Sequence, residues 1–503
     1  YANYNRKIGE DFELGAMVGH SFFKTRSRTS YIDAQNYPSP AFDVASVAAN
    51  IVDASAGLSE YAIESYFARL SLAYKDRYVV NATIRTDGSS RFAPDCRWGW
   101  FPSVSVGWNV SNESFWNAEK TDLKIRASYG RTGNQDGISN YGWQALISGG
   151  VNYGGQSGIA ISSSGNDRLT WETADQYNAG FDLSFLGGKI NMIADVYLKN
   201  TNNLLYSKPV HATTGETSIL SNIGSMRNKG VEFTINTHLN LGKVLWSSSF
   251  NIARNVNKLT SLLEDDLLSI GANRALKLGR TVGSWYIFRT DGIYQYDGEV
   301  PQALYDKGVR AGDVKYWDRN GDGNITDDDR IVTGNPNPKF SGGWNNTFKY
   351  KGLELSLFFT YSYGNDVYAS WMIHGSKPGY TRSLLKAYAD NRWTGPGTSD
   401  KYPRAIYSYS GWNGKNSTMY LTDGSFIRLR SVTLGYTFPQ RLVSKIHLKG
   451  LRVYAQGDNV FLCSRYPGWD PETSVNLDPR FYGEDNDGVP QPRIFKLGVN
   501  ITF

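Results

Sequence analysis

The stretch RIFKLGVNITF, residues 493–503, ends the chain and decides the fold. Its apolar side chains alternate with small or polar ones along the whole stretch. Because successive side chains of a strand point to opposite faces, one face of this strand meets an apolar environment and the other meets water. A strand of a soluble sandwich has the same pattern. The choice between a membrane barrel and a soluble sandwich therefore depends on whether alternating segments of roughly 9–11 residues, the length of a membrane-crossing strand, recur along the chain.

The composition excludes membrane-spanning helices and allows a membrane barrel. The chain has 503 residues, for which a soluble protein would have about three domains, but no linker divides it. Apolar residues make up 40%, mean hydropathy is -0.44, and no run of about 18 apolar residues occurs. A barrel hides its apolar band in alternate positions, and the 14% aromatic content with 33 Tyr suits the aromatic girdles of such a barrel.

Charge and cysteine content exclude two further classes. The net charge of +6 comes from 53 basic and 47 acidic residues without a dense basic block, which argues against nucleic-acid binding. Cys96 and Cys463 are the only cysteines, too few for a disulfide framework or a zinc knuckle. Two unpaired thiols are the favoured interpretation, and a bridge between them is the alternative. The chain opens at Tyr1 with neither Met nor a signal sequence, so we expect residues upstream of it.

Alternating segments of crossing length recur along the chain. They are residues 12–23, 66–74, 78–85, 100–110, 123–130, 177–185, 190–199, 231–239, 246–252, 340–350, 353–362, 426–438, 451–460 and 493–503. A partial strand at Tyr1 precedes them. Turn residues stand between neighbours at Lys75-Asp76-Arg77, Gly187-Gly188 and Gly352. Arg428 and Arg430 interrupt the alternation, which predicts a bulge near Leu429.

Short and long connections alternate between these segments. A sandwich has no reason to place every long loop on one side, whereas an outer-membrane barrel has short periplasmic turns and long external loops. We therefore predict an all-β fold, a large antiparallel transmembrane β-barrel occupying 1–503, with long extracellular loops at 256–339 and 363–424. A long loop is also expected from Lys24. The strand-like segment 282–296 would reverse the parity of all later strands, so we place it within the first of the two extracellular loops.

Seven motifs, taken in order, resemble the C-terminal part of the SusC/RagA-type TonB-dependent transporters. They are YKDRYVVNATIRTDGSSRF (74–92), FPSVSVGW (101–108), LKIRASYGRTGNQ (123–135), NIGSMRNKGVEF (222–233), DRNGDGNITDDDRIVTGNPNPKFSGG (318–343), DGSFIRLRSVTLGYTFP (423–439) and LGVNITF (497–503). The resemblance covers essentially the whole chain.

The resemblance implies an integral protein of the outer membrane of a Gram-negative bacterium, with a barrel of about 22 strands of which about 14 are present. It also implies an N-terminal plug, a SusD-like lipoprotein partner, and import of oligosaccharides or peptides with energy supplied through TonB. This chain has no plug and no TonB box. Because unpaired strand edges are costly in lipid, the missing strands must come from residues before Tyr1 or from a second polypeptide.

The segment 318–329 matches the spacing of a calcium loop. The oxygen ligands expected at its ligand positions are Asp318, Asn320, Asp322, Asn324, Thr326 and Asp329, with Gly323 at the sharp turn. Asp in place of Glu at the last position shortens the reach. The alternative is a surface turn rich in Asp and Asn that needs no ion. Ca²⁺ is the candidate cofactor at this loop, and we expect no organic cofactor.

Catalytic arrangements are absent from the sequence. The five histidines His20, His211, His238, His374 and His447 lie on separate segments, and no Ser or Cys occupies a nucleophile-elbow motif. We therefore expect no enzymatic activity and no catalytic residue.

Aromatic side chains in loops, with polar and charged neighbours, are the candidates for cargo contact. Rings in loops can stack on sugars or on peptide side chains, with Arg and Asn neighbours supplying hydrogen bonds. The candidates are Trp98, Trp100, Tyr141, Trp143, Tyr153, Trp412, Arg85 and Arg91. The alternative for each ring is packing of loop against loop, and for the two arginines it is attachment of the loop to the lumen wall.

The function expected from the resemblance is active import, with the plug coupling the barrel to TonB and with lipid around its outer surface. The alternative is a passive, secretion or structural outer-membrane barrel. The sequence does not distinguish glycan from peptide cargo.

Overall fold

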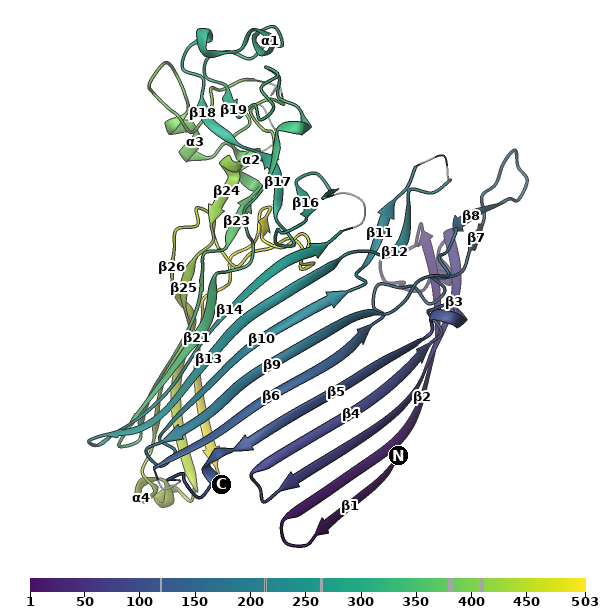
Figure 1. Ribbon diagram of the computed structural model, residues 1–503. Helices are drawn as coiled ribbons and strands as arrows, with labels where there is room; N and C mark the ends of the chain where they lie inside the picture. Colours follow the sequence, from purple (N-terminus) through teal and green to yellow (C-terminus); the bar gives the residue numbers. More distant parts are fainter. Residues whose placement is uncertain (118–119, 212, 214, 263–265, 379–382, 408–410) are drawn as a thin grey trace. The chain divides into compact units, whose positions relative to one another are not determined.

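An antiparallel sheet of 15 strands dominates the computed structural model, which describes residues 1–503 except 118–119, 212, 214, 263–265, 379–382 and 408–410 (Figure 1). Each strand is hydrogen-bonded to the next sheet strand along the chain. The strands are β1 (Ala2–Ile8), β2 (Phe12–Gln35), β3 (Asn50–Tyr74), β4 (Tyr78–Ser89), β5 (Trp98–Asn109), β6 (Thr121–Asn134), β9 (Glu172–Phe185), β10 (Ile190–Asn202), β13 (Ser225–Leu241), β14 (Val244–Ser261), β21 (Phe340–Tyr350), β22 (Leu353–Tyr363), β25 (Phe426–Thr437), β26 (Gly450–Ser464) and β28 (Ile494–Thr502). The predicted large antiparallel sheet is confirmed, and β1 is the partial strand expected at Tyr1.

Short turns join neighbouring strands where the sequence predicted them. Lys75 and Asp76, between β3 and β4, both have φ of 52°. Lys351 and Gly352, between β21 and β22, have φ of 46° and 87°. Positive φ at both central residues is the geometry of the two-residue turn whose twist matches that of paired strands. These turns explain how the register of each hairpin is held.

The chain divides into two compact units. The first contains Tyr1–Glu113, Ile125–Ala179 and Lys199–Ser225, and the second contains Ser114–Lys124, Gly180–Leu198 and Met226–Phe503. The first unit also holds two short hairpins, β7 (Leu146–Gly149) with β8 (Ile159–Ser163) and β11 (Leu205–Pro209) with β12 (Ser218–Asn222). A buried cluster of Phe92, Phe101, Ile138, Leu169 and Trp171 packs near the ends of its sheet strands.

The second unit carries its loops as small sheets and short helices. The elements are β15 (Leu267–Ile270), β16 (Arg274–Lys277), β17 (Trp285–Phe288), β18 (Thr290–Ile293), β19 (Val314–Tyr316), β20 (Arg330–Thr333), β23 (Asp366–Ala369), β24 (Leu421–Asp423), β27 (Glu484–Asp485), α1 (Gln302–Tyr305), α2 (Trp371–Gly375), α3 (Lys386–Asn391) and α4 (Gln440–Val443). The segment 282–296 forms β17 and β18, which belong to these small sheets and not to the 15-stranded one.

Two buried clusters hold the loops of the second unit together. One is centred on Trp285, Tyr368 and Tyr420, and the other on Phe288, Val314 and Tyr316. Both are built from segments far apart in sequence, so these loops have cores of their own. Within the described residues, no helix has the length and apolarity needed to span a membrane.

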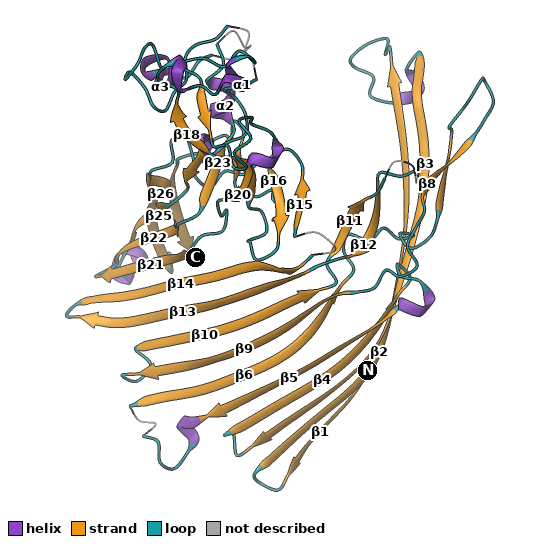
Figure 2. Cartoon of the chain, turned by 45° about the horizontal axis from the view of Figure 1, so that its top comes forward, coloured by secondary structure: helices purple, strands orange, loops and turns teal. Residues whose placement is uncertain are grey.

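The strands β2 and β3 are longer than predicted. The alternation predicts crossing segments at 12–23 and 66–74, whereas β2 continues to Gln35 and β3 begins at Asn50. The prediction of a long loop from Lys24 is therefore wrong, and residues 36–49 connect the two strands. The reason is that backbone pairing with β3 continues along β2 after the apolar alternation has ended. Figure 2 shows this two-stranded extension running beyond the ends of β4 and β5.

The predicted bulge near Leu429 is confirmed. Leu429 pairs with Phe359 and Ser431 with Phe358, so Arg430 is the extra residue of β25 against β22. Against β26, Leu429 pairs with Phe461 and Ser431 with Asp458, so the extra residue there belongs to β26. A one-residue insertion shifts the alternation of side chains between the two faces. The two cysteines, Cys96 and Cys463, are both free, as the favoured interpretation predicts.

Candidate functional site

The strands of the first unit present an apolar face that is bordered by aromatic rings at both ends. Tyr74, Tyr78 and Trp108 form one cross-strand row, and Tyr66, Thr86 and Trp100 form the fourth row from it on the same face. Leucine, valine, alanine, isoleucine and proline fill the rows between them, namely Leu72, Val80, Val106, Leu70, Ala82, Val104, Ala68, Ile84 and Pro102. Eight residues of strand between the two rows span about 27 Å. With the strand tilt of a barrel, this length matches the apolar band of an outer-membrane wall.

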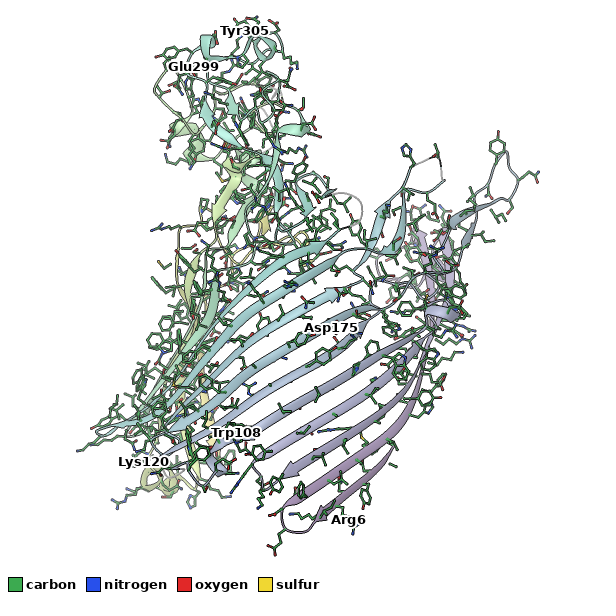
Figure 3. The ribbon with its side chains drawn as sticks, in the orientation of Figure 1. Arg6, Trp108, Lys120, Asp175, Glu299 and Tyr305 are labelled. Carbon is green, nitrogen blue, oxygen red and sulfur yellow. The ribbon has the colours of Figure 1, made fainter. Side chains whose placement is uncertain are left out.

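Figure 3 shows Trp108 near the turn end of β5 and Asp175 near the other end of the strands. Asp175 accepts hydrogen bonds from Tyr129 Oη at 2.8 Å and from Arg131 Nε and Nη2 at 2.8 and 3.0 Å. A buried carboxylate is stabilised by this bidentate pairing with a guanidinium. The contact links β6 to β9 near the loop end of the sheet.

The opposite face of the same strands is polar. Ser71, Asn81 and Ser105 lie in one row, and Ser71 Oγ donates to Asn81 Oδ1 at 2.8 Å. Arg69 and Thr83 follow in the next row. Small and hydrogen-bonding side chains on this face suit a wall that borders water.

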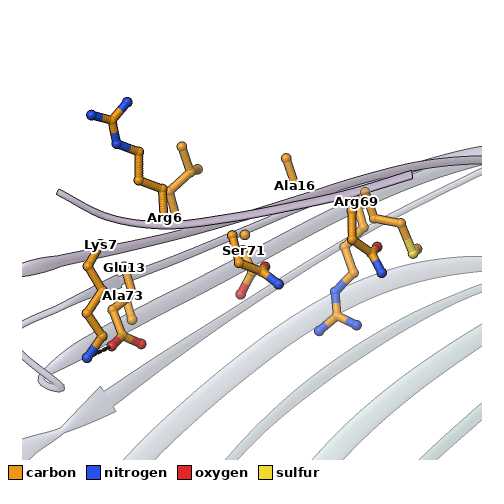
Figure 4. Close-up of a pocket in the computed structure, with 12 residues that line it drawn as sticks. Arg6, Lys7, Glu13, Ala16, Arg69, Ser71 and Ala73 are labelled. Atoms are coloured by element: carbon orange, nitrogen blue, oxygen red, sulfur yellow. Dashed lines mark ion pairs between the residues drawn. The ribbon is translucent and has the colours of Figure 1, made fainter. Parts of the chain in front are cut away.

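A hollow of about 640 Å³ lies over the polar side of β1, β2 and β3. Figure 4 shows Lys7, Glu13, Arg69 and Ser71 on one side of the strands, with Lys7 and Glu13 in an ion pair of 2.6 Å. Arg6 points to the other side. The hollow is a surface of mixed charge on the water-bordering face.

The two candidate arginines are engaged within the protein. Arg85 Nε donates to both carboxylate oxygens of Asp87 at 2.9 and 2.8 Å, and Arg85 Nη2 donates to Ser65 Oγ at 2.9 Å. Arg91 lies over the Tyr61 ring at 4.4 Å and donates to Asn140 Oδ1 at 3.0 Å. The contacts of Arg91 support the alternative that this side chain attaches loops to the wall, whereas Arg85 joins residues of the wall strands β3 and β4.

Trp98, expected in a loop, lies in β5, as does Trp100, with which the predicted segment 100–110 begins. They pair with Gly88 and Thr86, in register with the aromatic end of the apolar face. Their side chains are therefore directed away from the polar face, and their exposed fractions are 44% and 59%. The strand begins at Trp98 because backbone pairing with β4 extends that far.

The remaining aromatic candidates differ in their surroundings. Trp412 packs against the cluster of Phe288 and Tyr316, and its Nε1 donates to Val314 O at 2.9 Å. Tyr153 is 91% exposed in the loop between β7 and β8. Tyr141 and Trp143 share one pocket of about 320 Å³.

In the segment 318–329, which has the spacing of a calcium loop, the side-chain oxygens accept hydrogen bonds from the backbone of the same segment. Asp318 accepts the N–H groups of Gly321 and Gly323, both at 2.7 Å. Asn320 accepts from the backbone of Asp322 at 3.0 Å, and Asp322 from that of Asn324 at 2.7 Å. Such bonds define turns rich in Asp and Asn that need no ion.

The end of the same loop is closed by a buried carboxylate. Asp329 has no exposed surface and accepts from the N–H groups of Arg319 at 2.8 Å and Thr326 at 2.7 Å. The Asn324 amide oxygen accepts from Lys307 Nζ at 2.7 Å. Among the described residues, no group of three His, Cys, Asp or Glu side chains is arranged to hold a metal. Calcium binding stays a prediction.

Two buried arginines that the sequence analysis did not assign to a site fix the loops of the second unit. Arg428 Nη2 is 2.5 Å from Asp470 Oδ1, and Arg428 Nε is 2.7 Å from Glu472 Oε2. Arg274 Nη2 donates to the carbonyls of Phe481 and Tyr482 at 3.2 and 3.0 Å. Burial lowers the pKa of the Arg274 guanidinium to about 10. For Arg428, the interruption of the apolar alternation was a sequence signal of this contact, because an arginine at such a position needs a buried acidic partner. Arg274 had no such signal in the sequence.

A family model described as TonB dependent receptor-like, beta-barrel matches residues 1–460. TonB-dependent receptor P26 of Formosa agariphila is 33% identical over 99% of the chain, and SusC of Bacteroides thetaiotaomicron is 29% identical over all of it. The chain spans about half the length of the curated relatives it matches, 52% of the first protein and 49% of the second.

The fold has a solved counterpart. The chain superimposes on the RagAB peptide transporter with a TM-score of 0.86 and 23% identity, over 100% of this chain and 54% of that one. The likeness extends along the entire chain, so the sheet and its loops follow a known arrangement.

Proposed function

Because the chain belongs to the TonB-dependent receptor-like β-barrel family, we propose that it forms the barrel wall of an active importer of oligosaccharides or peptides. It is an integral outer-membrane segment, as its family and its two-faced strands require. In the proposed mechanism, cargo passes along the polar face and energy arrives through TonB. A plug outside this chain would couple the two, and a SusD-like lipoprotein would deliver the cargo.

The proposal rests on one observation: the same strands have an apolar face and, on the opposite side, a polar face. Rows such as Leu72, Val80 and Val106 face one side, and rows such as Ser71, Asn81 and Ser105 face the other. The first suits lipid and the second suits a water-filled passage. Solved proteins of the same fold are named peptide transporters and importers, which supports the class of activity and leaves glycan and peptide cargo for experiment.

The test uses the full-length gene in its own host. Uptake of labelled oligopeptides and of labelled oligosaccharides is measured in the wild-type strain, in a strain lacking the gene, and in a strain lacking TonB. We expect one cargo class to lose uptake in both deletion strains. Uptake that depends on the gene but persists without TonB would instead indicate the passive barrel.

Copurification tests the proposed partner. The full-length protein carrying an affinity tag is extracted from outer membranes, and the proteins bound to it are identified by mass spectrometry. A stoichiometric SusD-like lipoprotein is the expected result. A transporter that still imports its cargo while no lipoprotein accompanies it would contradict this part of the proposal.

A further inference from the structure

We propose that the pocket bordered by Lys24, Glu60, Arg97, Tyr141 and Trp143 binds the phosphorylated sugar headgroup of an outer-leaflet glycolipid. The pocket has a volume of about 320 Å³ and lies entirely within the first unit, between the extended part of β2 and β3 and the segment 140–144. The inference rests on the outer-membrane location of the chain and is independent of the cargo proposed above.

The β2 side of the pocket is rich in positive charge. Lys24, Arg26 and Arg28 alternate along β2 and therefore project from the same face. Glu60 is the shared partner of the first two, at 3.1 Å from Lys24 Nζ and 3.0 Å from Arg26 Nε. Against these three cations the same face presents two carboxylates, Glu60 and Glu64, which leaves an excess of positive charge and favours an anionic ligand.

Arg97 adds a cation with incomplete hydrogen bonding. Its backbone carbonyl is fixed by Trp171 Nε1 at 2.9 Å, which places the residue at the edge of a buried cluster. In the part of the chain that the structure describes, its buried Nε has no hydrogen-bond acceptor. An unpaired buried donor is unfavourable, and a phosphate oxygen is a strong acceptor for a guanidinium.

Aromatic rings supply a surface for a sugar. Trp143 is held by its Nε1, which donates to Ser90 O at 3.3 Å, and Tyr141 is held by its hydroxyl, which accepts from Glu60 N at 3.0 Å. Rings fixed by their polar atoms offer faces for stacking at little cost in side-chain entropy. Asn140 also borders the pocket and adds a polar side chain. The lining therefore combines the groups that recognise a phosphate with those that recognise a sugar.

The position of the pocket identifies the source of such a headgroup. Lys24 pairs with Ala62, four residues along β3 from the aromatic row of Tyr66. That separation is about 13 Å of strand, on the same face as the apolar band. Phe22, two residues before Lys24, is 63% exposed on that face and can contact acyl chains. On its Lys24 side the pocket thus continues the lipid-facing surface at the height of the headgroups, on the long-loop side of the wall, while Tyr61, which also borders it, belongs to the opposite face of β3.

The test uses delipidated full-length protein in detergent. Its probes are a bisphosphorylated diglucosamine glycolipid, the same glycolipid after phosphatase treatment, and a water-soluble glucosamine phosphate, each titrated and detected by native mass spectrometry. We expect the intact glycolipid to bind at least tenfold more tightly than the other two. The double variant Lys24→Ala with Arg97→Ala should lose that tenfold preference.

Lys7→Ala is the matched control, because Lys7 is an exposed, ion-paired lysine on the water-bordering face, and its variant should bind as the wild type does. Equal binding of the intact and phosphatase-treated glycolipids by the wild type would overturn the proposal without any variant. Equal binding of the soluble sugar phosphate would overturn the lipid source. Full retention of the preference by the folded double variant would overturn the assignment of the pocket.

Discussion

The guanidinium carbon of Arg274 lies 4.1 Å from the centre of the Trp285 ring, and neither side chain has exposed surface. Arg274 donates from the same guanidinium to the carbonyls of Phe481 and Tyr482, and Glu484 Oε2 lies 3.9 Å from it. One side chain therefore joins β16 and β17 to a segment about 200 positions later. Removing a buried charge that satisfies several groups leaves those groups unpaired, which is more costly than losing a surface contact.

Replacing Arg274 with Leu should release the segment around Phe481. The loss of the guanidinium removes the stacking on Trp285 and the bonds to the carbonyls, a local destabilisation of about 3 kcal/mol. Hydrogen exchange of the full-length protein should show faster exchange in 478–485 and around Trp285. Arg274→Lys should recover only part of the protection, because Lys lacks the planar group. Arg289→Leu, at a half-exposed site paired with Asp291, is the control and should change neither segment.

Arg428→Leu should detach the loop that follows β26. Asp470 is 4% exposed and would lose its charged partner inside the protein, at a cost of about 3–5 kcal/mol. The expected result is a new protease-sensitive region within 465–493 of the full-length protein. Arg430→Leu is the matched control, because Arg430 is more exposed and contacts the partly exposed carboxylate of Glu472 and the Asn459 amide oxygen. Equal sensitivity of both variants would contradict a special role for the buried pair.

The contribution of Glu113 to the stability of the sheet, near the turn that follows β5, should be lost in acid. Hydrogen bonds from Tyr78 Oη at 2.6 Å and Trp108 Nε1 at 3.1 Å, with Arg77 nearby, hold the pKa of Glu113 below its ordinary value of 4.5. A carboxylate with a lowered pKa in the folded state stabilises the fold above its unfolded pKa, and the contribution is lost as pH falls through the folded pKa.

The measurement is the difference in melting temperature between the wild type and Glu113→Gln from pH 7 to pH 3. The wild type should melt higher at neutral pH, and the difference should disappear below pH 4.5, where the folded glutamate becomes protonated. Glu10→Gln, in the turn before β2, is the control for changing a carboxylate at this end of the sheet. If the difference in melting temperature grew on acidification, the Glu113 carboxylate would not stabilise the folded state in the way proposed.

Calcium removal tests the metal prediction for 318–329. If Ca²⁺ binds the side chains of Asp318, Asn320 and Asp322, its removal with EGTA should increase proteolysis within this loop in the full-length protein, and added Ca²⁺ should restore resistance. Asp318→Asn should abolish the effect of Ca²⁺. If cleavage is independent of EGTA in the wild type, the hydrogen bonds to Gly321 and Gly323 hold the turn without an ion.

Alternation and turn residues were enough to predict the main sheet, because both are local properties. The two-residue period of LGVNITF and of the segment 66–74 reports which neighbours share a face, and the Lys75-Asp76 pair reports a turn of the required twist. The interruption of the alternation at Arg428 and Arg430 was likewise enough to predict a bulge near Leu429.

The ends of strands and the partners of loop side chains were decided only by the tertiary structure. Apolar alternation stops near Phe23, yet β2 continues because β3 offers backbone partners, and that pairing is not local. The loop cores are set by contacts between distant segments, as Arg274 and Phe481 illustrate.

The candidate site was likewise predicted in part from the sequence and completed only by the tertiary structure. Sequence alone selected Tyr141 and Trp143 as aromatic residues of a loop, but Lys24 and Arg97 join them only after β2, β3 and the segment 140–144 are folded together. The period of a strand is fixed by the geometry of each residue, whereas a pocket depends on which surfaces meet. The sequence by itself therefore determined a two-faced membrane wall, and the tertiary structure decided which of its side chains lie together.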